Sequence, residues 1–213
     1  MTSPENYLVV FLRHGESEGN SQGVHQGQAD FPLTPRGRAQ AQALAQRWAA
    51  QGVTFDGIIS SPLARAAQTA LLVARALGFP EAQIQYDAVW QERDKGELTG
   101  LPFEQTAGTP PSSLFAPVGE TGESLWEVYQ RATEALRRLL QRPPGRYLVV
   151  SHGGILNWVL RAALSIPPQP YPHAPSFRLP NAAYVILQYA PARHQWAMFG
   201  LCHRLDDAIF PCQ

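Results

Sequence analysis

The chain has 213 residues, of which 45% are hydrophobic and 16% are charged, so it is a globular chain and not a disordered one. Lys plus Arg and Asp plus Glu number 17 each, and a formal net charge of zero gives nucleic acid or an anionic membrane no general attraction. Any phosphate chemistry must therefore use a local group of cations.

Predicted strands and helices alternate along the chain. In chain order we expect a strand at 7–12, a loop at 13–30, a helix at 35–51, a strand at 55–60, a helix at 61–77, a weak strand at 84–86, an irregular excursion at 93–122, a helix at 123–141, a strand at 146–150, a helix at 154–164, a proline-rich loop at 167–180, and strands at 182–189 and 195–201. The strand runs are continuously apolar, which is typical of parallel strands buried on both faces. The pattern predicts an α/β fold in which helices cover both faces of a mainly parallel central sheet.

The composition also limits location and metal binding. The apolar run Tyr7–Leu12 is too short for a membrane span or a signal-peptide core, so we expect a cytoplasmic protein with no membrane partner. Two cysteines, Cys202 and Cys212, are too few for a zinc cluster, although a disulfide between them is possible.

Two predicted strands end in a histidine followed by glycine. One strand leads into Arg13, His14 and Gly15, and the strand at 146–150 leads into His152 and Gly153. Ligands bind outside the carboxyl ends of parallel strands, and glycine lets a ligand or a neighbouring backbone approach closely. One such histidine would more often be a buried structural residue, but two at matching strand ends indicate a site.

Three segments that contain these residues resemble a known family in their order and spacing. The segments are LRHGES at Leu12–Ser17, SSPLARAAQT at Ser60–Thr69 and SHGG at Ser151–Gly154. They are similar to the histidine phosphatase superfamily, the phosphoglycerate-mutase-like group, and favour its phosphatase branch. GESL at 122–125 and PNAAYVIL at 180–187 also resemble family segments. The resemblance covers most of the chain, from about residue 7 to residue 189, and implies the phosphoglycerate-mutase-like fold.

The resemblance implies a nucleophile and a set of phosphate ligands. His14 would attack phosphorus and become phosphohistidine, while Arg13, Arg65 and His152 would hold the phosphoryl oxygens. Arginine suits this role because its planar fork binds two oxygens and stays charged. Fixed cationic donors stabilise the charge on the phosphoryl group in flight. His14 must be neutral to attack, whereas His152 is expected to be protonated.

The resemblance also implies a proton donor and a further phosphate contact. Glu92 would give a proton to the leaving group and later act as base on water. Glu97, in the same loop, is a rival for this role. Asn20 matches a polar residue that contacts the phosphate, although it could be a turn residue. The other histidines, His25, His173, His194 and His203, are expected to be structural or exposed.

We therefore expect one domain over 1–213, with the excursion at 93–122 and the loop at 167–180 covering the site. The expected activity is metal-independent hydrolysis of small organic phosphomonoesters without a cofactor; the oligomeric state is open. One alternative is a cofactor-dependent phosphoglycerate mutase, which the short span of 60 positions from Glu92 to His152 disfavours. A non-catalytic phospho-ligand binder is another. A metal-dependent hydrolase is disfavoured because no carboxylate cluster surrounds the histidines.

Overall fold

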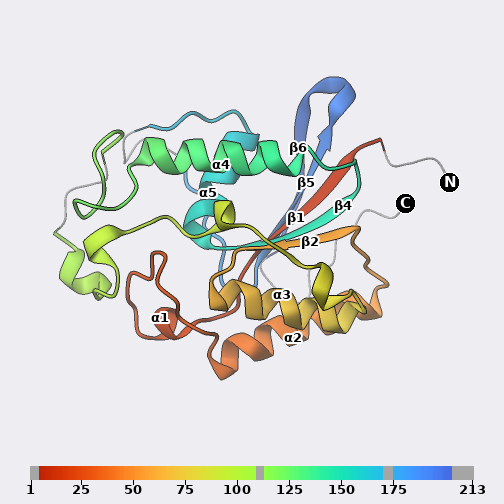
Figure 1. The fold of residues 1–213 in the computed structure, drawn as a ribbon, viewed down its shortest axis with the longest axis horizontal. Coiled ribbons are helices and arrows are strands. Elements are labelled where there is room, and N and C mark those ends of the chain that lie inside the picture. The colour runs from red at the N-terminus through yellow and green to blue at the C-terminus, as the bar shows by residue number, and fades with distance from the viewer. Residues whose placement is uncertain (1–4, 109–112, 170–174, 203–213) are drawn as a thin grey trace.

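Six strands form one sheet through the middle of the molecule (Figure 1). The computed structural model describes residues 5–108, 113–169 and 175–202. In sheet order the strands are β3 (Gln85–Tyr86), β2 (Gly57–Ser60), β4 (Arg146–Ser151), β1 (Tyr7–Arg13), β5 (Tyr184–Ala190) and β6 (Gln195–Cys202). The first four run parallel, whereas β5 runs antiparallel to both β1 and β6. The predicted α/β fold with a mainly parallel sheet is confirmed.

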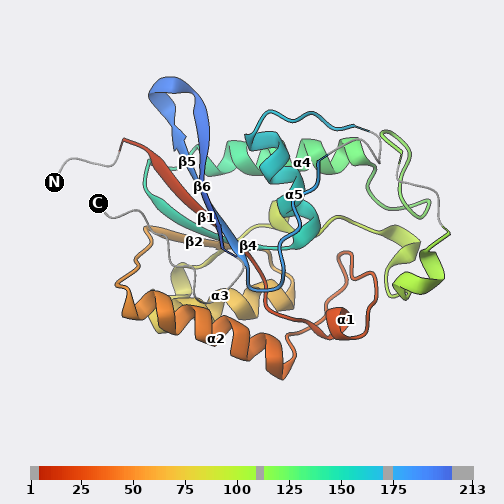
Figure 2. The same cartoon turned by 180° about the vertical axis from the view of Figure 1, so that it is seen from behind.

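Helices cover both faces of this sheet, as Figures 1 and 2 show. On one face lie α2 (Pro35–Ala50) and α3 (Ala64–Leu77), and on the other lie α4 (Leu125–Leu139) and α5 (Gly153–Ala163). Successive side chains of β1 point alternately to the two faces of the sheet and pack against the two helix layers. Val10 and Leu12 pack in the same cluster as residues of α2 and α3, whereas Val9 and Phe11 pack in the same cluster as residues of α4 and α5. The strand is apolar throughout because both of its faces are buried.

Some element boundaries differ from the prediction, for local reasons. The segment expected to be a loop contains the short helix α1 (Glu18–Ser21). α3 begins at Ala64 because the Ser61 amide still donates to the Val150 carbonyl at 3.0 Å, which prolongs the strand pairing. α4 begins at Leu125 because Ser124 caps it in a capping box.

Short 3-10 helices complete the regular structure. They lie at Glu81–Gln83, Ala88–Trp90, Gly96–Leu98, Phe103–Thr106 and Pro191–Arg193. No helix in the described part of the chain has the length and apolar character needed to cross a membrane. Three residues of the sequence analysis lie outside the described residues: Cys212, His173 and His203. Because Cys212 is one of them, the disulfide with Cys202 is not tested.

The register between β1 and β4 brings the two histidine segments together. Arg13 is paired with Ser151 at the carboxyl ends of these neighbouring parallel strands. His14 and His152 each follow by one residue, so both leave the sheet at the same edge. Three further segments lie at that end of the sheet (Figure 1): the chain between β1 and α2, the segment after β3, and the start of α5.

Candidate active site

His14 and His152 lie side by side beyond the ends of β1 and β4. Their ring centroids are 5.1 Å apart, and the His14 amide donates to the Ser151 carbonyl at 3.0 Å. The exposed fraction is 2% for His14 and 0% for His152. The sequence prediction that two distant histidines meet at one rim of the sheet therefore agrees with the structure.

One hydrogen bond fixes the tautomer of His14. Nδ1 lies 2.6 Å from the carbonyl oxygen of Gly15, and a carbonyl can only accept, so Nδ1 carries the proton. The lone pair is then on Nε2, where an imidazole nucleophile needs it. Burial first, and then the charges of Arg13 and Arg65, lower the pKa of His14 well below its ordinary value. The ring is therefore neutral at physiological pH.

His152 differs from the expectation that it is protonated. Its Nδ1 accepts a hydrogen bond from Nε of Arg65 at 3.1 Å, so Nδ1 carries no proton. Its Nε2 lies 2.8 Å from Oγ of Ser61 and, as the remaining ring N–H, donates to it. Burial, followed by the charge of Arg65, lowers the pKa of His152 well below its ordinary value. The prediction of a protonated His152 is wrong for this structure because an arginine N–H points at its ring.

Two arginines supply the positive charge around the histidine pair. Arg65 is 1% exposed, and its two terminal nitrogens donate to the carbonyls of Ala29 and Gly27 at 2.8 and 2.9 Å. Burial is the main reason that its pKa is lowered to about 10, so the group stays charged at neutral pH. Arg13 donates from one terminal nitrogen to the Leu179 carbonyl at 2.6 Å. Each guanidinium has five N–H donors, which leaves donors for phosphoryl oxygens.

These groups line a cleft with a volume of about 360 Å³. Its described lining includes Arg13, His14, Asn20, Val24, His25, Gln26, Gly27, Arg65, Glu92, Arg93, Lys95, Phe103, Gly154, Asn157 and Trp158. His152 is not among these side chains. The structure thus brings five of the six predicted site residues to the cleft wall and leaves His152 buried beside His14 and Arg65.

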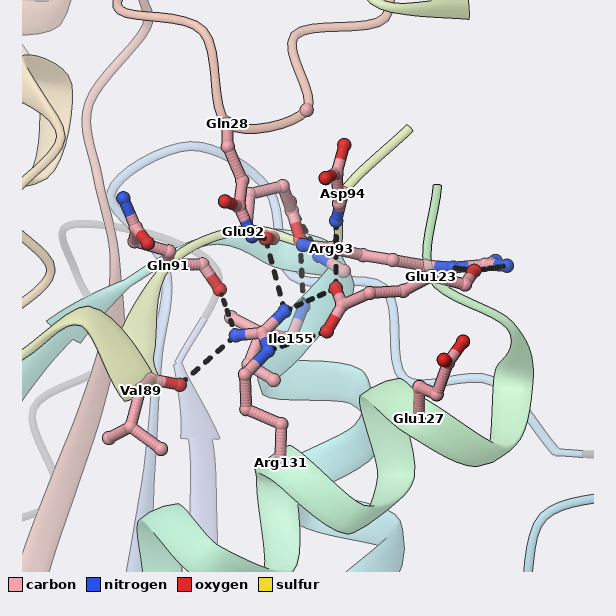
Figure 3. A network of polar contacts seen from close by, with 12 residues as sticks. Gln28, Val89, Gln91, Glu92, Arg93, Asp94, Glu123, Glu127, Arg131 and Ile155 are labelled. Atoms are coloured by element: carbon pink, nitrogen blue, oxygen red, sulfur yellow. Dashed lines mark hydrogen bonds and ion pairs between the residues drawn. The ribbon is translucent and has the colours of Figure 1, made fainter. Parts of the chain in front are cut away.

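Glu92 reaches the cleft from the segment between β3 and α4. Its Oε2 accepts from the Gly154 amide at 2.9 Å, and its Oε1 accepts from the amides of Ile155 at 2.9 Å and Arg93 at 2.7 Å (Figure 3). The first two are N–H groups at the start of α5, which no carbonyl within the helix can satisfy. A carboxylate also suits the positive end of the helix dipole. Glu97, the rival for the acid role, is exposed and is not part of the described lining.

Gly154 is the residue that allows this approach. A Cβ atom there would collide with Oε1 of Glu92. The second glycine of the SHGG segment is thus required by the close contact between α5 and the Glu92 carboxyl group.

Asn20 lines the cleft and also takes part in the capping box at the start of α1. Its Oδ1 accepts from the Ser17 amide at 3.2 Å, so Asn20 has the turn role that we considered as well as a place in the cleft. Asn181, which we did not single out, donates from Nδ2 to Oδ1 of Asn20 at 3.0 Å and to the His14 carbonyl at 3.2 Å. Its place in the family-like segment at 180–187 was the available signal.

Two more contacts escaped prediction. Ser61 binds His152, and its place in the family-like segment at 60–69 was the signal. His25, expected to be only structural or exposed, lines the cleft, bonds Oγ1 of Thr106 at 2.7 Å and packs edge-on against Phe103. His194 is exposed in the turn between β5 and β6, as expected.

The cationic donors of the site are the guanidinium groups of Arg13 and Arg65. Among the residues that the structure describes, no three His, Cys, Asp or Glu side chains are placed to hold a metal ion together. The arrangement can bind an anion and present a neutral imidazole to it.

Known proteins that are similar to this chain come from one family. The sequence profile of the histidine phosphatase superfamily (branch 1) matches residues 9–201. The "Probable phosphoglycerate mutase GpmB" of Cronobacter sakazakii is 36% identical over 172 residues, which cover 75% of each chain. A phosphoserine phosphatase from Entamoeba histolytica, solved as a variant with phosphoserine, is 26% identical with a TM-score of 0.77 and covers 94% of this chain and 98% of its own. A mycobacterial glucosyl-3-phosphoglycerate phosphatase shares the fold at 24% identity, with a TM-score of 0.73 and 91% and 97% of the two chains covered.

Proposed function

The chain belongs to branch 1 of the histidine phosphatase superfamily. From this membership we propose that it is a phosphatase that hydrolyses small organic phosphomonoesters through a phosphohistidine at His14. The observation that carries the proposal is the neutral His14 in a cleft between two charged arginines, with its lone pair on Nε2. No hydrogen bond joins that nitrogen to a described residue, so it is available to phosphorus.

In the first step Nε2 of His14 attacks phosphorus, and the bond from phosphorus to the ester oxygen breaks. Arg13 and Arg65 line the cleft and stabilise the charge on the equatorial oxygens. His152 would complete the set by exchanging the hydrogen bond from its Nε2–H to Ser61 for one to a phosphoryl oxygen. Asn20 would contact the same group from the cleft wall.

Glu92 moves the proton in both steps. It gives a proton to the leaving alkoxide, and in the second step it takes one from the water that attacks phosphorus and breaks the P–N bond. Main-chain N–H groups face both carboxyl oxygens, so one oxygen must turn away from them to reach the leaving group.

The substitution His14→Ala tests the nucleophile. We expect turnover to fall by about a thousandfold or more, because no other group can form the intermediate. Rapid quench with labelled substrate should trap an acid-labile, base-stable phosphoenzyme in the wild type only. More than a few per cent of residual activity in His14→Ala would falsify the mechanism.

Chelation tests metal independence. The arginines supply the positive charge that a metal ion would otherwise supply. We expect activity to survive prolonged EDTA treatment, and vanadate to inhibit because it resembles the transferring phosphoryl group. Activity that is lost to EDTA and restored by a divalent ion would refute metal independence.

A mutase is the second candidate, because the curated relative at 36% identity has a mutase name. Such an enzyme must rebind a second anionic group. Assay with 3-phosphoglycerate and its bisphosphate primer distinguishes the two, and we expect negligible mutase activity.

A further inference from the structure

A half-buried ion pair lies beside the segment that carries Glu92 (Figure 3). Arg131 of α4 donates from Nε to Oε1 of Glu123 at 2.7 Å and from Nη2 to Oε2 at 2.6 Å. Only 18% of each side chain is exposed. Because two guanidinium nitrogens each bind one carboxylate oxygen, the two planar groups meet in the bidentate geometry in which arginine binds carboxylates most strongly. Below, these two residues are called the brace.

Arg131 also binds the main chain on both sides of the Glu92 side chain. Nη1 donates to the carbonyls of Val89 at 3.0 Å and Gln91 at 2.6 Å, and Nη2 donates to the carbonyl of Glu92 itself at 3.1 Å. Figure 3 shows these bonds converging on one guanidinium group. One side chain thus fixes the main-chain path that leads into Glu92.

Glu123 holds the same segment on its other side. Its Oε2 accepts from the Asp94 amide at 2.8 Å, and its main-chain carbonyl accepts from Nη2 of Arg93 at 2.6 Å. Residues 91–95 have no helix or strand of their own. Buried main-chain groups in such a segment need partners from elsewhere, and the brace supplies them.

The brace and α5 hold Glu92 from two directions. The brace fixes its main chain, while the first amides of α5 hold its carboxyl group. A displacement of the main chain would pull the carboxyl group away from the cleft, and a misplacement of about 1 Å can cost about a hundredfold in rate.

We propose that Arg131, held by Glu123, is the positioning residue for Glu92 as proton donor. This inference rests on the proposed function, since it requires that Glu92 protonates the leaving group. General acid catalysis matters most for a poor leaving group. Loss of the brace should therefore slow hydrolysis of alkyl phosphates selectively and leave activated aryl phosphates much less affected.

The test is Arg131→Lys, assayed for kcat/KM on an alkyl phosphate and an activated aryl phosphate. Lysine keeps the charge but has no planar fork, so it cannot hold Glu123 and three carbonyls together. We expect a loss of about tenfold or more on the alkyl ester, within the ~10²–10⁴ that a positioned acid contributes, and a loss below about threefold on the aryl ester. Arg137→Lys is the matched control, because Arg137 lies on the same helix, is exposed and pairs with Glu134; it should match the wild type.

A double-substitution cycle with Glu92→Gln separates positioning from a general structural role. If Arg131 acts through Glu92, Arg131→Lys adds little further loss on the alkyl ester once Glu92 is replaced. An equal loss on both esters, no loss on either, or a full loss that persists in the Glu92→Gln background would overturn the inference. Glu123→Gln provides the same test, with the same expected selectivity, if Arg131→Lys does not fold.

Failure of this inference is distinguishable from failure of the proposed function. If Glu92→Gln itself shows no dependence on the leaving group, the acid assignment is wrong. If Glu92→Gln is selective and both brace variants are not, only the positioning role is wrong.

Discussion

His14 and His152 are neighbours in the interior, and burial is the main reason that the pKa of each lies well below its ordinary value. Well above the ordinary histidine pKa of about 6.5 both rings are neutral in the folded and the unfolded chain. Below that value the unfolded chain binds protons that the folded chain does not. The free energy of unfolding should therefore fall as the pH falls, by at most about 1.4 kcal/mol per pH unit for each histidine.

Urea unfolding at pH 7 and pH 5.5 tests this dependence. His14→Gln removes one of the two groups, so the variant should lose less stability between the two pH values than the wild type does. His194→Gln, at an exposed residue, is the matched control for replacing a histidine by glutamine. Equal pH dependence in the wild type and His14→Gln would contradict the prediction.

Residue types and positions at strand ends allowed most of the site to be predicted. Arg13 ends one apolar strand and His14 follows it, and Arg65 follows a Ser-Ser-Pro turn after another strand, so topology alone brings them to one rim. The protonation of His152 could not be predicted, because it depends on which atom of Arg65 points at the ring. Arg65 and His152 are 87 positions apart in the sequence, and the local residue pattern does not indicate the direction in which either side chain points.

At the level of the element, the first turn of α5 also binds the Glu92 side chain. Its amides hold the Glu92 carboxyl group, and Gly154 leaves the space in which that group lies. A Cβ on the neighbouring Gly153 would lie 3.4 Å from the Arg13 guanidinium, an ordinary contact distance.

Gly154→Ala should therefore displace Glu92 and lower kcat/KM for alkyl phosphates by about tenfold or more. Gly153→Ala should cause a much smaller loss. The comparison uses the same two esters as the brace experiment, together with thermal unfolding of both variants. A larger loss in Gly153→Ala than in Gly154→Ala would show that the contact with Glu92 is unimportant.

Single elements were predictable where their pattern is local, and their arrangement was not. The apolar runs identified β1 and β4, and the amphipathic spacing identified α4, although its first residue was predicted two positions too early. The antiparallel direction of β5 has no signature in its own residues, because it follows from how the connection after α5 returns to the sheet. The brace was missed for a similar reason: Arg131 binds main-chain carbonyls 39 to 42 positions away in a segment without periodicity.

The cleft as a whole combines segments that are far apart in the chain, and its chemistry limits the leaving group. Val24, Phe103 and Trp158 provide apolar surface. Of the two described cations that line the cleft outside the phosphate site, Arg93 donates to the Glu123 carbonyl, whereas the side chain of Lys95 has no hydrogen bond or ion pair with the described residues. Among the described residues that line the cleft, a second anionic group on the substrate would thus find Lys95 as the cation without such a partner, and an unpaired charge in a cleft is costly.

We therefore expect kcat/KM to be higher for aryl or neutral sugar monophosphates than for phosphoglycerates or sugar bisphosphates. Buried apolar surface on the leaving group contributes about 25 cal/mol per Å². A substrate panel measured on the wild type and on Lys95→Met checks this. A preference for phosphoglycerates that disappears in Lys95→Met would show that Lys95 recruits a second anion and that the expectation is wrong.

The order of the strands in the sheet has a consequence for how the protein is made. β4 lies between β1 and β2, yet it is synthesised after both of them and more than 80 residues after β2 ends. A growing polypeptide on the ribosome therefore cannot join its first two strands, and the main-chain groups on the edges that pair with β4 stay without these partners until residue 151 has emerged. Such late, long-range pairing slows folding and exposes the nascent chain to aggregation. The insertion of β4 between β1 and β2 also brings His152 to His14, so the two histidines should meet only when the parallel part of the sheet has been joined.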